Sequence, residues 1–372
     1  MMRPRLAALM SASALALSTL GAQQSSRDSH SPRAPVSIGN YPNVAGLRLN
    51  FRDRDLERVR GVNVTVWSAY APATGVVKGM ALGLPVTDAG SIEGFGTGLF
   101  GVGASDQLRG IFLAPIGAGS GGRVRGIVIG GVGAGAGGDL DGLFLGGVGA
   151  GAGGDARGIL VGGVGAGVGG NFTGVAFGGV GVGAGGRAKG LFVGGVGAGA
   201  GGSMKGVAVG GVGVGAGGDV TGIAVGGVGT GAGGNFKGIA LGGVGAGAGG
   251  RLTGFALGGV GVGAGERIHG VAIGGVGVGA PRLDGAFAAL AVGGRDVHAL
   301  VIAPAYFKVE REGSFRGASV SAVNYVRGSQ TGLTLGVVNY ARTVHGVQLG
   351  LINVIADNGA HRFLPLINWG TR

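Results

Sequence analysis

The chain offers several sets of residues that could do chemistry, and the first is a column of carboxylates beside paired glycines. Asp139, Asp155 and Asp219 each follow a Gly-Gly pair. In calcium-binding β-rolls such a carboxylate recurs in nearly every turn on a nine-residue period. In other copies of the present repeat the position holds an amide or a guanidinium: Asn171, Asn235, Arg187 and Arg251. Because an arginine repels a cation, we expect a solvated corner here and no calcium.

Two further sets lack the context that their chemistry requires. Glycine runs such as Gly146–Gly151 have the composition of a phosphate loop, but that mechanism needs a preceding strand, a following helix and usually a Lys-Ser/Thr pair. Four histidines lie immediately before the position that is usually the recurring glycine, where other copies hold lysine, threonine or aspartate: His269, His298, His345 and His361. We therefore expect polar corners, no metal, no cofactor and no enzymatic activity.

A set of asparagines gives a more specific pattern. Asn324, Asn339 and Asn353 each lie seven residues after a glycine that begins an apolar triplet, and Asn368 matches this spacing within one residue. Stacked asparagines form amide ladders along arrays of strands. We predict that the four form one aligned structural column.

The elements that position these residues are repeats. Between Gly122 and Ala280 the chain writes nearly the same sixteen residues ten times, as in Gly202–Gly217. A fixed period in this range indicates a solenoid or array. Each copy has an anchor glycine before an apolar triplet, such as Gly206, and looser copies extend the series from residue 46 to the end. We count about 21 units.

Each unit contains two short strand candidates, for example 222–225 and 212–216, with turns at the Gly-Gly pairs and at the polar corner. Two strands and two corners fit one coil of an all-β solenoid, and stacking at about 4.8 Å per coil gives a rod on the order of 100 Å long. The alternative is an outer-membrane antiparallel β-barrel with one strand per unit. We favour the solenoid because corner residues show no difference between odd and even units.

The triplets differ between the centre and the ends of the array. Terminal triplets have a polar middle residue, as in Leu333-Thr334-Leu335, and central triplets an apolar one. Strand alternation then predicts a solvated outer face at the ends and an apolar outer face at the centre. That apolar face is predicted to contain Phe144, Leu160, Phe192, Ala208, Ala224 and Ala240. Soluble monomers rarely expose an apolar face of this size to water, so we expect the protein to self-associate through it.

Composition and the first residues of the chain predict how the chain is divided into segments. Residues 1–22 resemble a signal peptide, 23–42 a flexible leader, 43–121 degenerate N-terminal repeats, 122–280 the regular repeats and 281–372 degenerate C-terminal repeats. The net charge of +12 comes with mixed signs inside the repeats and with two Trp and five Tyr, so we expect no nucleic-acid partner. The chain has no cysteine and therefore no disulfides.

The C-terminal copies 332–339, 346–353 and 364–368 resemble the bacterial surface-repeat family first named from a leptospiral protein. The resemblance covers roughly residues 317–369, and the glycine-rich centre departs from it. It implies a surface location and brings no activity or functional residues. We predict an exported, non-catalytic structural or binding repeat protein of the cell surface or outer envelope. Its expected partners are itself or envelope components, and membrane association fits the apolar face. An outer-membrane pore is the alternative.

Overall fold

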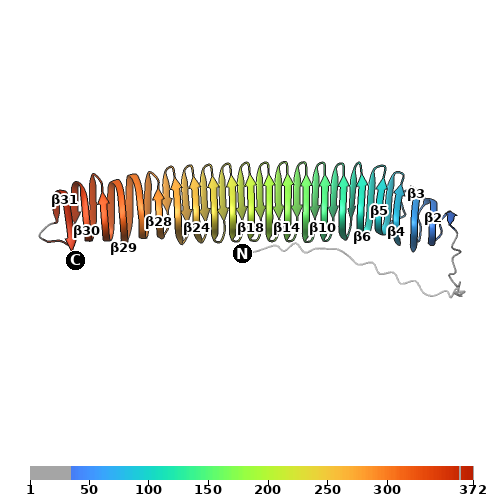
Figure 1. Ribbon diagram of the computed structural model, residues 1–372, viewed down its shortest axis with the longest axis horizontal. Helices are drawn as coiled ribbons and strands as arrows, with labels where there is room; N and C mark the ends of the chain where they lie inside the picture. The colour runs from blue at the N-terminus through green and yellow to red at the C-terminus, as the bar shows by residue number, and fades with distance from the viewer. Residues whose placement is uncertain (1–34, 360–361, 372) are drawn as a thin grey trace, which may run out of the picture. The chain divides into compact units, whose positions relative to one another are not determined.

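The computed structural model describes residues 35–359 and 362–371. The predicted signal peptide, most of the predicted leader and His361 lie outside these residues. The described chain is all-β, with 75% of it in strands, and winds into about 19 turns of a parallel solenoid (Figure 1). The predicted fold and period are therefore confirmed, with slightly fewer turns than the 21 units counted. The described residues contain no helix long and apolar enough to cross a membrane.

Each regular turn contributes one long and one short strand. In one turn these are β18 (Met204–Gly210) and β19 (Gly213–Ala216). β18 pairs in parallel with β20 (Val220–Gly226), and β20 pairs with β22 (Phe236–Gly242). β19 pairs likewise with β21 (Gly229–Ala232). Long strands thus form one parallel sheet and short strands another, with every residue beside the residue sixteen positions on. This register is incompatible with the antiparallel barrel.

The other strands follow the same scheme. The remaining long strands of the regular region are β8 (Arg123–Gly130), β10 (Leu140–Gly146), β12 (Ala156–Gly162), β14 (Phe172–Gly178), β16 (Ala188–Gly194), β24 (Arg251–Gly258) and β26 (Arg267–Gly274). The remaining short strands are β7 (Gly117–Ser120), β9 (Gly133–Ala136), β11 (Gly149–Ala152), β13 (Gly165–Val168), β15 (Gly181–Ala184), β17 (Gly197–Ala200), β23 (Gly245–Ala248), β25 (Gly261–Ala264) and β27 (Gly277–Gly279). The less regular ends contain β1 (Val36–Ile38), β2 (Asn43–Arg52), β3 (Arg58–Trp67), β4 (Val76–Gly83), β5 (Val86–Gly98), β6 (Gly101–Ala114), β28 (Arg282–Ala288), β29 (Ala291–Leu335), β30 (Val338–Ile355) and β31 (Phe363–Thr371).

The core lies between the two sheets and is filled by side chains of complementary size. In two neighbouring turns large and small residues exchange places: Phe172 accompanies Ala176, and Ala188 accompanies Phe192. From Met204 to Ala272 every turn has the larger residue at the start of the long strand and alanine in the middle of the triplet. The rings of Phe172 and Phe192 meet edge-on at 5.4 Å. Such combinations of large and small residues let neighbouring turns interdigitate at the density of a protein interior.

The predicted apolar outer face is wrong in its residues. Phe144, Leu160, Phe192, Ala208, Ala224 and Ala240 are all fully buried in the core. The terminal triplets obey the same alternation, because the polar middle residues Arg48, Asn63, Thr334 and Gln348 are buried as well. Position in the strand, and not the polarity of the side chain, therefore decides whether a triplet residue faces water or the core. The outer face is instead built from the residues that flank the middle one.

The two ends of the array also differ from expectation. β1 lies inside the predicted flexible leader, yet it pairs in parallel with β2 through Val36 and Leu47. At the other end, β31 returns antiparallel to β30, with Trp369 opposite Val347. The last predicted copy is therefore a reversed strand that covers the edge of the long-strand sheet, and no further parallel coil forms there.

The anchor glycines explain why the repeat requires glycine at this point. From Gly46 to Gly346 the glycines of the column have φ between +116° and +146°. At Gly206 an added Cβ would lie 2.1 Å from the carbonyl oxygen of Gly190. A side chain would therefore meet both a strained backbone and the preceding turn.

We predict that Gly206→Ala lowers the free energy of unfolding by about 2 kcal/mol or more, because strained backbone and a backbone clash add. The matched control is Gly215→Ala in the same turn, where the nearest atom to an added Cβ is 3.8 Å away. Urea unfolding of dilute protein, followed by circular dichroism, compares the two. Equal effects of both substitutions would contradict the role of the anchor column.

Candidate functional surfaces

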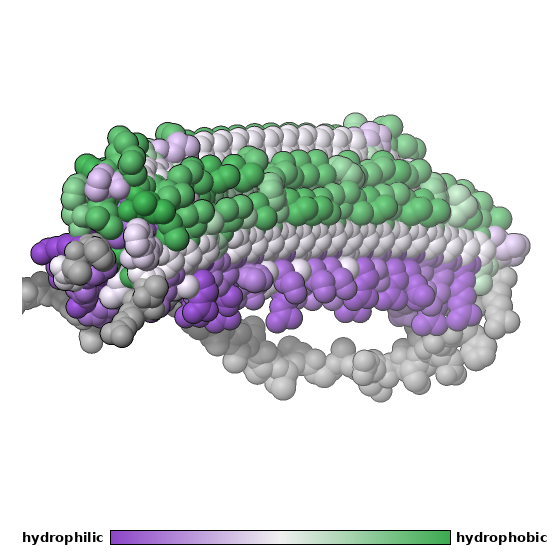
Figure 2. All heavy atoms as spheres, turned by 60° about the vertical axis from the view of Figure 1, so that its left-hand side comes forward, coloured by the Kyte–Doolittle hydropathy of each residue, from purple (hydrophilic) through white to green (hydrophobic). Residues whose placement is uncertain are grey.

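The outward residues of the long strands form a continuous apolar surface that we call the aliphatic face. It consists of the two flanking residues of each triplet in the ten regular turns: Ile127, Ile129, Leu143, Leu145, Ile159, Val161, Val175, Phe177, Leu191, Val193, Val207, Val209, Ile223, Val225, Ile239, Leu241, Phe255, Leu257, Val271 and Ile273. Ile159 is 43% exposed and Phe177 40%. Figure 2 shows an unbroken hydrophobic band along the array of turns. At about 4.8 Å per turn and about 10 Å across, the face covers about 500 Å².

A second surface, the basic column, runs beside the aliphatic face. It consists of the residue before the anchor glycine in the ten consecutive turns from Gly110 to Gly254: Arg109, Arg125, Asp141, Arg157, Thr173, Lys189, Lys205, Thr221, Lys237 and Thr253. Parallel register stacks these residues directly, as with Lys205 and Thr221. Six of the ten carry a positive charge and one a negative charge. Asp141 pairs with Arg125 at 3.5 Å. In Figure 2 the hydrophilic band runs parallel to the hydrophobic one, with a paler band between them.

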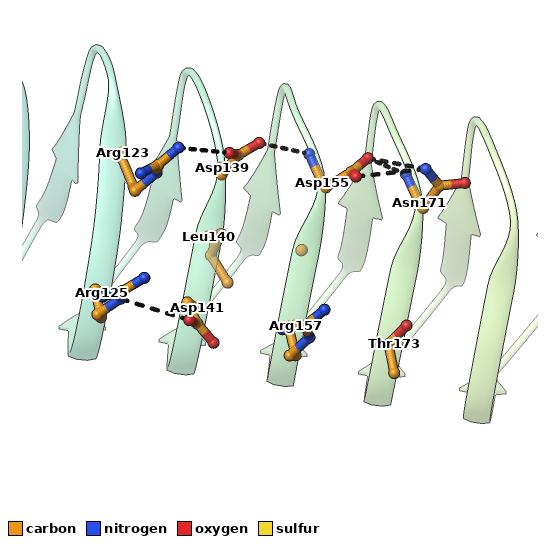
Figure 3. A pocket seen from close by; sticks show the side chains of 10 residues that line it. Arg123, Arg125, Asp139, Leu140, Asp141, Asp155, Arg157, Asn171 and Thr173 are labelled. Atoms are coloured by element: carbon orange, nitrogen blue, oxygen red, sulfur yellow. Dashed lines mark hydrogen bonds and ion pairs between the residues drawn. The ribbon is translucent and has the colours of Figure 1, made fainter.

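The corner residues beyond the basic column form a hydrogen-bonded ladder (Figure 3). Asp139 accepts from the backbone N–H of Asp155 at 3.1 Å, and Asp155 accepts from that of Asn171 at 2.7 Å. Asn171 in turn accepts from Arg187 at 2.9 Å. The backbone N–H and side-chain amide of Asn171 lower the pKa of Asp155. Each Asp and Asn side chain of this column thus accepts from the backbone of the next turn, and Asp219 and Asn235 do so in the same way. Among the described residues no cluster of His, Asp or Glu is arranged to hold a metal ion.

The predicted asparagine column forms at the C-terminal end of the core, with one exception. Asn324 donates from Nδ2 to Oδ1 of Asn339 at 2.7 Å, and Asn339 donates likewise to Asn353 at 2.7 Å. All three are fully buried. Asn368 is buried too, but it lies on the antiparallel β31, opposite Gln348, and its Nδ2 donates to the backbone oxygen of Asn353 at 3.4 Å. The column therefore has three members, and the fourth closes its end.

A buried polar network closes the N-terminal end of the core, and sequence reasoning missed it. Arg48 is fully buried and pairs with Asp53. Its guanidinium also donates to Oδ1 of Asn63 and Oδ1 of Asn40, both at 2.9 Å. Thr65 donates to Asp53 at 2.8 Å. The signal was present in the polar middle residues of the terminal triplets, which we had placed in water.

The charge balance in this network is visible in the pKa of Asp53. Burial alone would raise the pKa, but the hydrogen bond and positive charge of Arg48, with further hydrogen bonds from Asn50 and Thr65, hold it below its usual value. The carboxylate is therefore the form that the folded N-terminal turns prefer.

No family model, curated protein or solved structure matches the chain. The resemblance of the C-terminal copies to the leptospiral surface-repeat family stays a prediction.

We predict that Asn339→Ala destabilises the C-terminal turns by about 2 to 3 kcal/mol, because it leaves the buried amide of Asn324 and the buried oxygen of Asn353 without their partner. Trp369 fluorescence during urea unfolding, in a Trp67→Phe background, reports this end. Asn171→Ala, which removes a rung of the exposed corner ladder, is the control and should change little. A similar small effect of both variants would show that the buried ladder is not required.

We predict that the N-terminal turns lose stability in acid through Asp53. Because its folded-state pKa lies below the ordinary value of 3.8, its contribution is present above that pH and disappears as the pH falls through the folded-state pKa. At neutral pH, Asp53→Asn should cost about 3 kcal/mol, since it leaves Arg48 buried without its counter-ion. Trp67 fluorescence in a Trp369→Phe background follows unfolding, and the gap between variant and wild type should shrink in acid. A gap independent of pH would contradict the assignment.

Proposed function

We propose that the protein is an exported, non-catalytic rod of the cell envelope that lies with its aliphatic face on an anionic membrane surface. The observation that carries the proposal is the parallel course of the aliphatic face and the basic column along the same sheet. An apolar surface flanked by lysine and arginine is the arrangement by which interfacial elements sit at the boundary between headgroups and acyl chains.

The apolar contribution comes from residues that the fold leaves uncovered. Ile159 and Ile223 are 43% and 38% exposed, although isoleucine is among the residue types most often buried. An apolar patch of about 500 Å² is at the upper end of what a monomer leaves in water. Burying apolar area contributes about 25 cal/mol per Å², so many weak contacts along the rod add to a firm attachment.

The charged contribution comes from the basic column. Each lysine or arginine near an anionic lipid surface contributes about 1 kcal/mol. Lys189, Lys205 and Lys237 lie beside the aliphatic face, because only the anchor glycine separates each of them from the first aliphatic residue of its turn. Their apolar stems can lie along the lipid while the ammonium groups reach the headgroups.

Export and the absence of catalysis are parts of the same proposal. The basic and apolar start of residues 1–22 and the resemblance of the C-terminal copies support export. A function spread over identical columns supports a structural or binding role, because a catalytic site needs a specific constellation of residues in defined positions. Repeated weak contacts on one rigid rod raise the overall affinity by multivalency.

We predict that the full chain sediments with vesicles of phosphatidylcholine and more strongly with vesicles that also contain phosphatidylglycerol. Salt should remove the difference between the two lipids, because it screens the basic column. Ile159→Lys, Leu191→Lys and Ile223→Lys combined should weaken binding to both by at least about tenfold. These positions lie in alternate turns, so the new charges are not adjacent.

The matched control introduces the same three charges on the basic column as Thr173→Lys, Thr221→Lys and Thr253→Lys. It should bind anionic vesicles at least as well as the wild type. A wild type that stays in the supernatant, or two triple variants that bind equally, would refute the membrane role of the aliphatic face.

A further inference from the structure

The outward residues of the short strands form a second continuous surface, the glycine face, on the opposite side of the core from the aliphatic face. In the ten short strands, which are the odd-numbered strands from β9 to β27, both outward positions are glycine: Gly133, Gly135, Gly149, Gly151, Gly165, Gly167, Gly181, Gly183, Gly197, Gly199, Gly213, Gly215, Gly229, Gly231, Gly245, Gly247, Gly261, Gly263, Gly277 and Gly279. The inward positions alternate with them and hold buried residues such as Ala198 and Val214. The face is therefore bare backbone over ten turns.

The fold itself does not require glycine on most of this face. In the column from Gly133 to Gly261 an added Cβ would find its nearest heavy atom 3.4–3.9 Å away, which is ordinary contact, and at Gly277 none lies within 4 Å. In the second column Gly135, Gly151 and Gly247 are tighter, at 3.0, 2.7 and 3.3 Å, but Gly167 has no atom within 4 Å. None of these glycines has the positive φ of the anchor column. Alanine or a larger residue could stand at most of these positions.

Glycine is also an unfavourable choice for a strand. It loses more conformational freedom on folding than any other residue and offers no side chain to pack. Glycine nevertheless stands at all twenty outward positions of the short strands. Because glycine costs stability there and the turn does not need it, we infer that contact with another molecule requires it. That requirement is flatness, because glycine is the residue that lets another backbone approach closely.

We propose that the glycine face binds the glycine face of a second copy of the chain. The occupant has to be flat and uncharged, because the face presents neither charged nor hydrogen-bonding side chains between Gly133 and Gly279. It also has to stay in contact over ten turns that repeat at about 4.8 Å. A second copy meets all three conditions, since its own glycine face has the same spacing. Paired sheets with identical small residues pack in this way as dry, closely fitting interfaces.

The available area agrees with a stable pair. Ten turns at about 4.8 Å and four residues at about 3.3 Å give about 600 Å² for each copy. The two copies together bury about 1,200 Å², which is the lower end of the range for specific interfaces. A row of half-exposed valines at the edge of the face, which includes Val212 at 49% and Val228 at 48%, enlarges the contact. A two-fold axis makes such a surface self-complementary.

The pairing is independent of the proposed membrane function. The two faces lie on opposite sheets, so a pair joined through its glycine faces leaves both aliphatic faces outward. Loss of one contact should leave the other intact, and the two proposals can fail separately.

Sedimentation of the full chain over a range of concentrations tests the pairing. The wild type should reach a dimer at micromolar concentration, and Gly197→Glu with Gly213→Glu should raise the dissociation constant by at least about tenfold, because side chains and like charges then separate the faces. The matched control places the same residue on the basic column of neighbouring turns as Lys189→Glu with Lys205→Glu, and should dimerise as the wild type does. Circular dichroism verifies that each variant keeps its strands.

Gly197→Ala with Gly213→Ala decides the matter if the glutamate variant does not fold, since two methyl groups should weaken the pair measurably while adding no charge. The combined Ile159→Lys, Leu191→Lys and Ile223→Lys variant should stay dimeric. A wild type that is monomeric at tens of micromolar, glycine-face variants that dimerise as well as the wild type, or a dimer lost in the aliphatic variant alone would each overturn the proposal.

Discussion

Parallel, in-register stacking of the turns is the constraint on which the structure depends. In the regular turns each strand residue is the register partner of the residue sixteen positions away, as Gly206 is of Gly222 and Gly222 of Gly238. At the anchor column the turns approach so closely that a single Cβ would penetrate the preceding carbonyl. Once this register is set, a residue's environment is decided by its column, and residues of one column share one task along the rod.

The columns divide these tasks clearly. In most regular turns the inward columns combine a large core residue with a small one. The corner column of Asp139, Asp155 and Asn171 links turn to turn through backbone N–H groups. The core is closed by polar side chains at both ends, around Arg48 and around Asn339. Terminal turns of repeat proteins need such special ends, because they have a neighbour on one side only. The outward columns of the central turns carry no comparable internal task and are free to serve binding.

Much of the architecture could be predicted from the sequence because the repeat is strict. The period, the parallel direction, the anchor glycines and the ladder of Asn324, Asn339 and Asn353 all follow from spacing. The direction of the triplets could not be read from polarity. Thr230 shows why: its hydroxyl points into the core and has no hydrogen-bond partner among the described residues, so alternation prevails over the preference of the side chain. The candidate surfaces were consequently assigned to the wrong triplet residues.

The ends of the array were harder to predict for a different reason. A strand at the end of a stack is held by one neighbour, and its direction is not fixed by the repeat. β31 runs antiparallel to β30, and Trp369 lies opposite Val347. β1 adds one short parallel strand from a segment of low apolar content, which composition alone marks as a leader.

Disulfide trapping between adjacent turns tests the stacking most directly, since the chain has no cysteine of its own. Lys205 and Thr221 are register partners in the basic column, and Lys237 lies one turn further on. Their Cα atoms should be about 4.8 Å and about 9.6 Å from Lys205 respectively, and a disulfide needs about 4.4–6.8 Å. Oxidation should close the bond within one chain in Lys205→Cys with Thr221→Cys, and not in Lys205→Cys with Lys237→Cys. Equal closure in both, or closure in the second pair alone, would contradict a solenoid with one turn every sixteen residues.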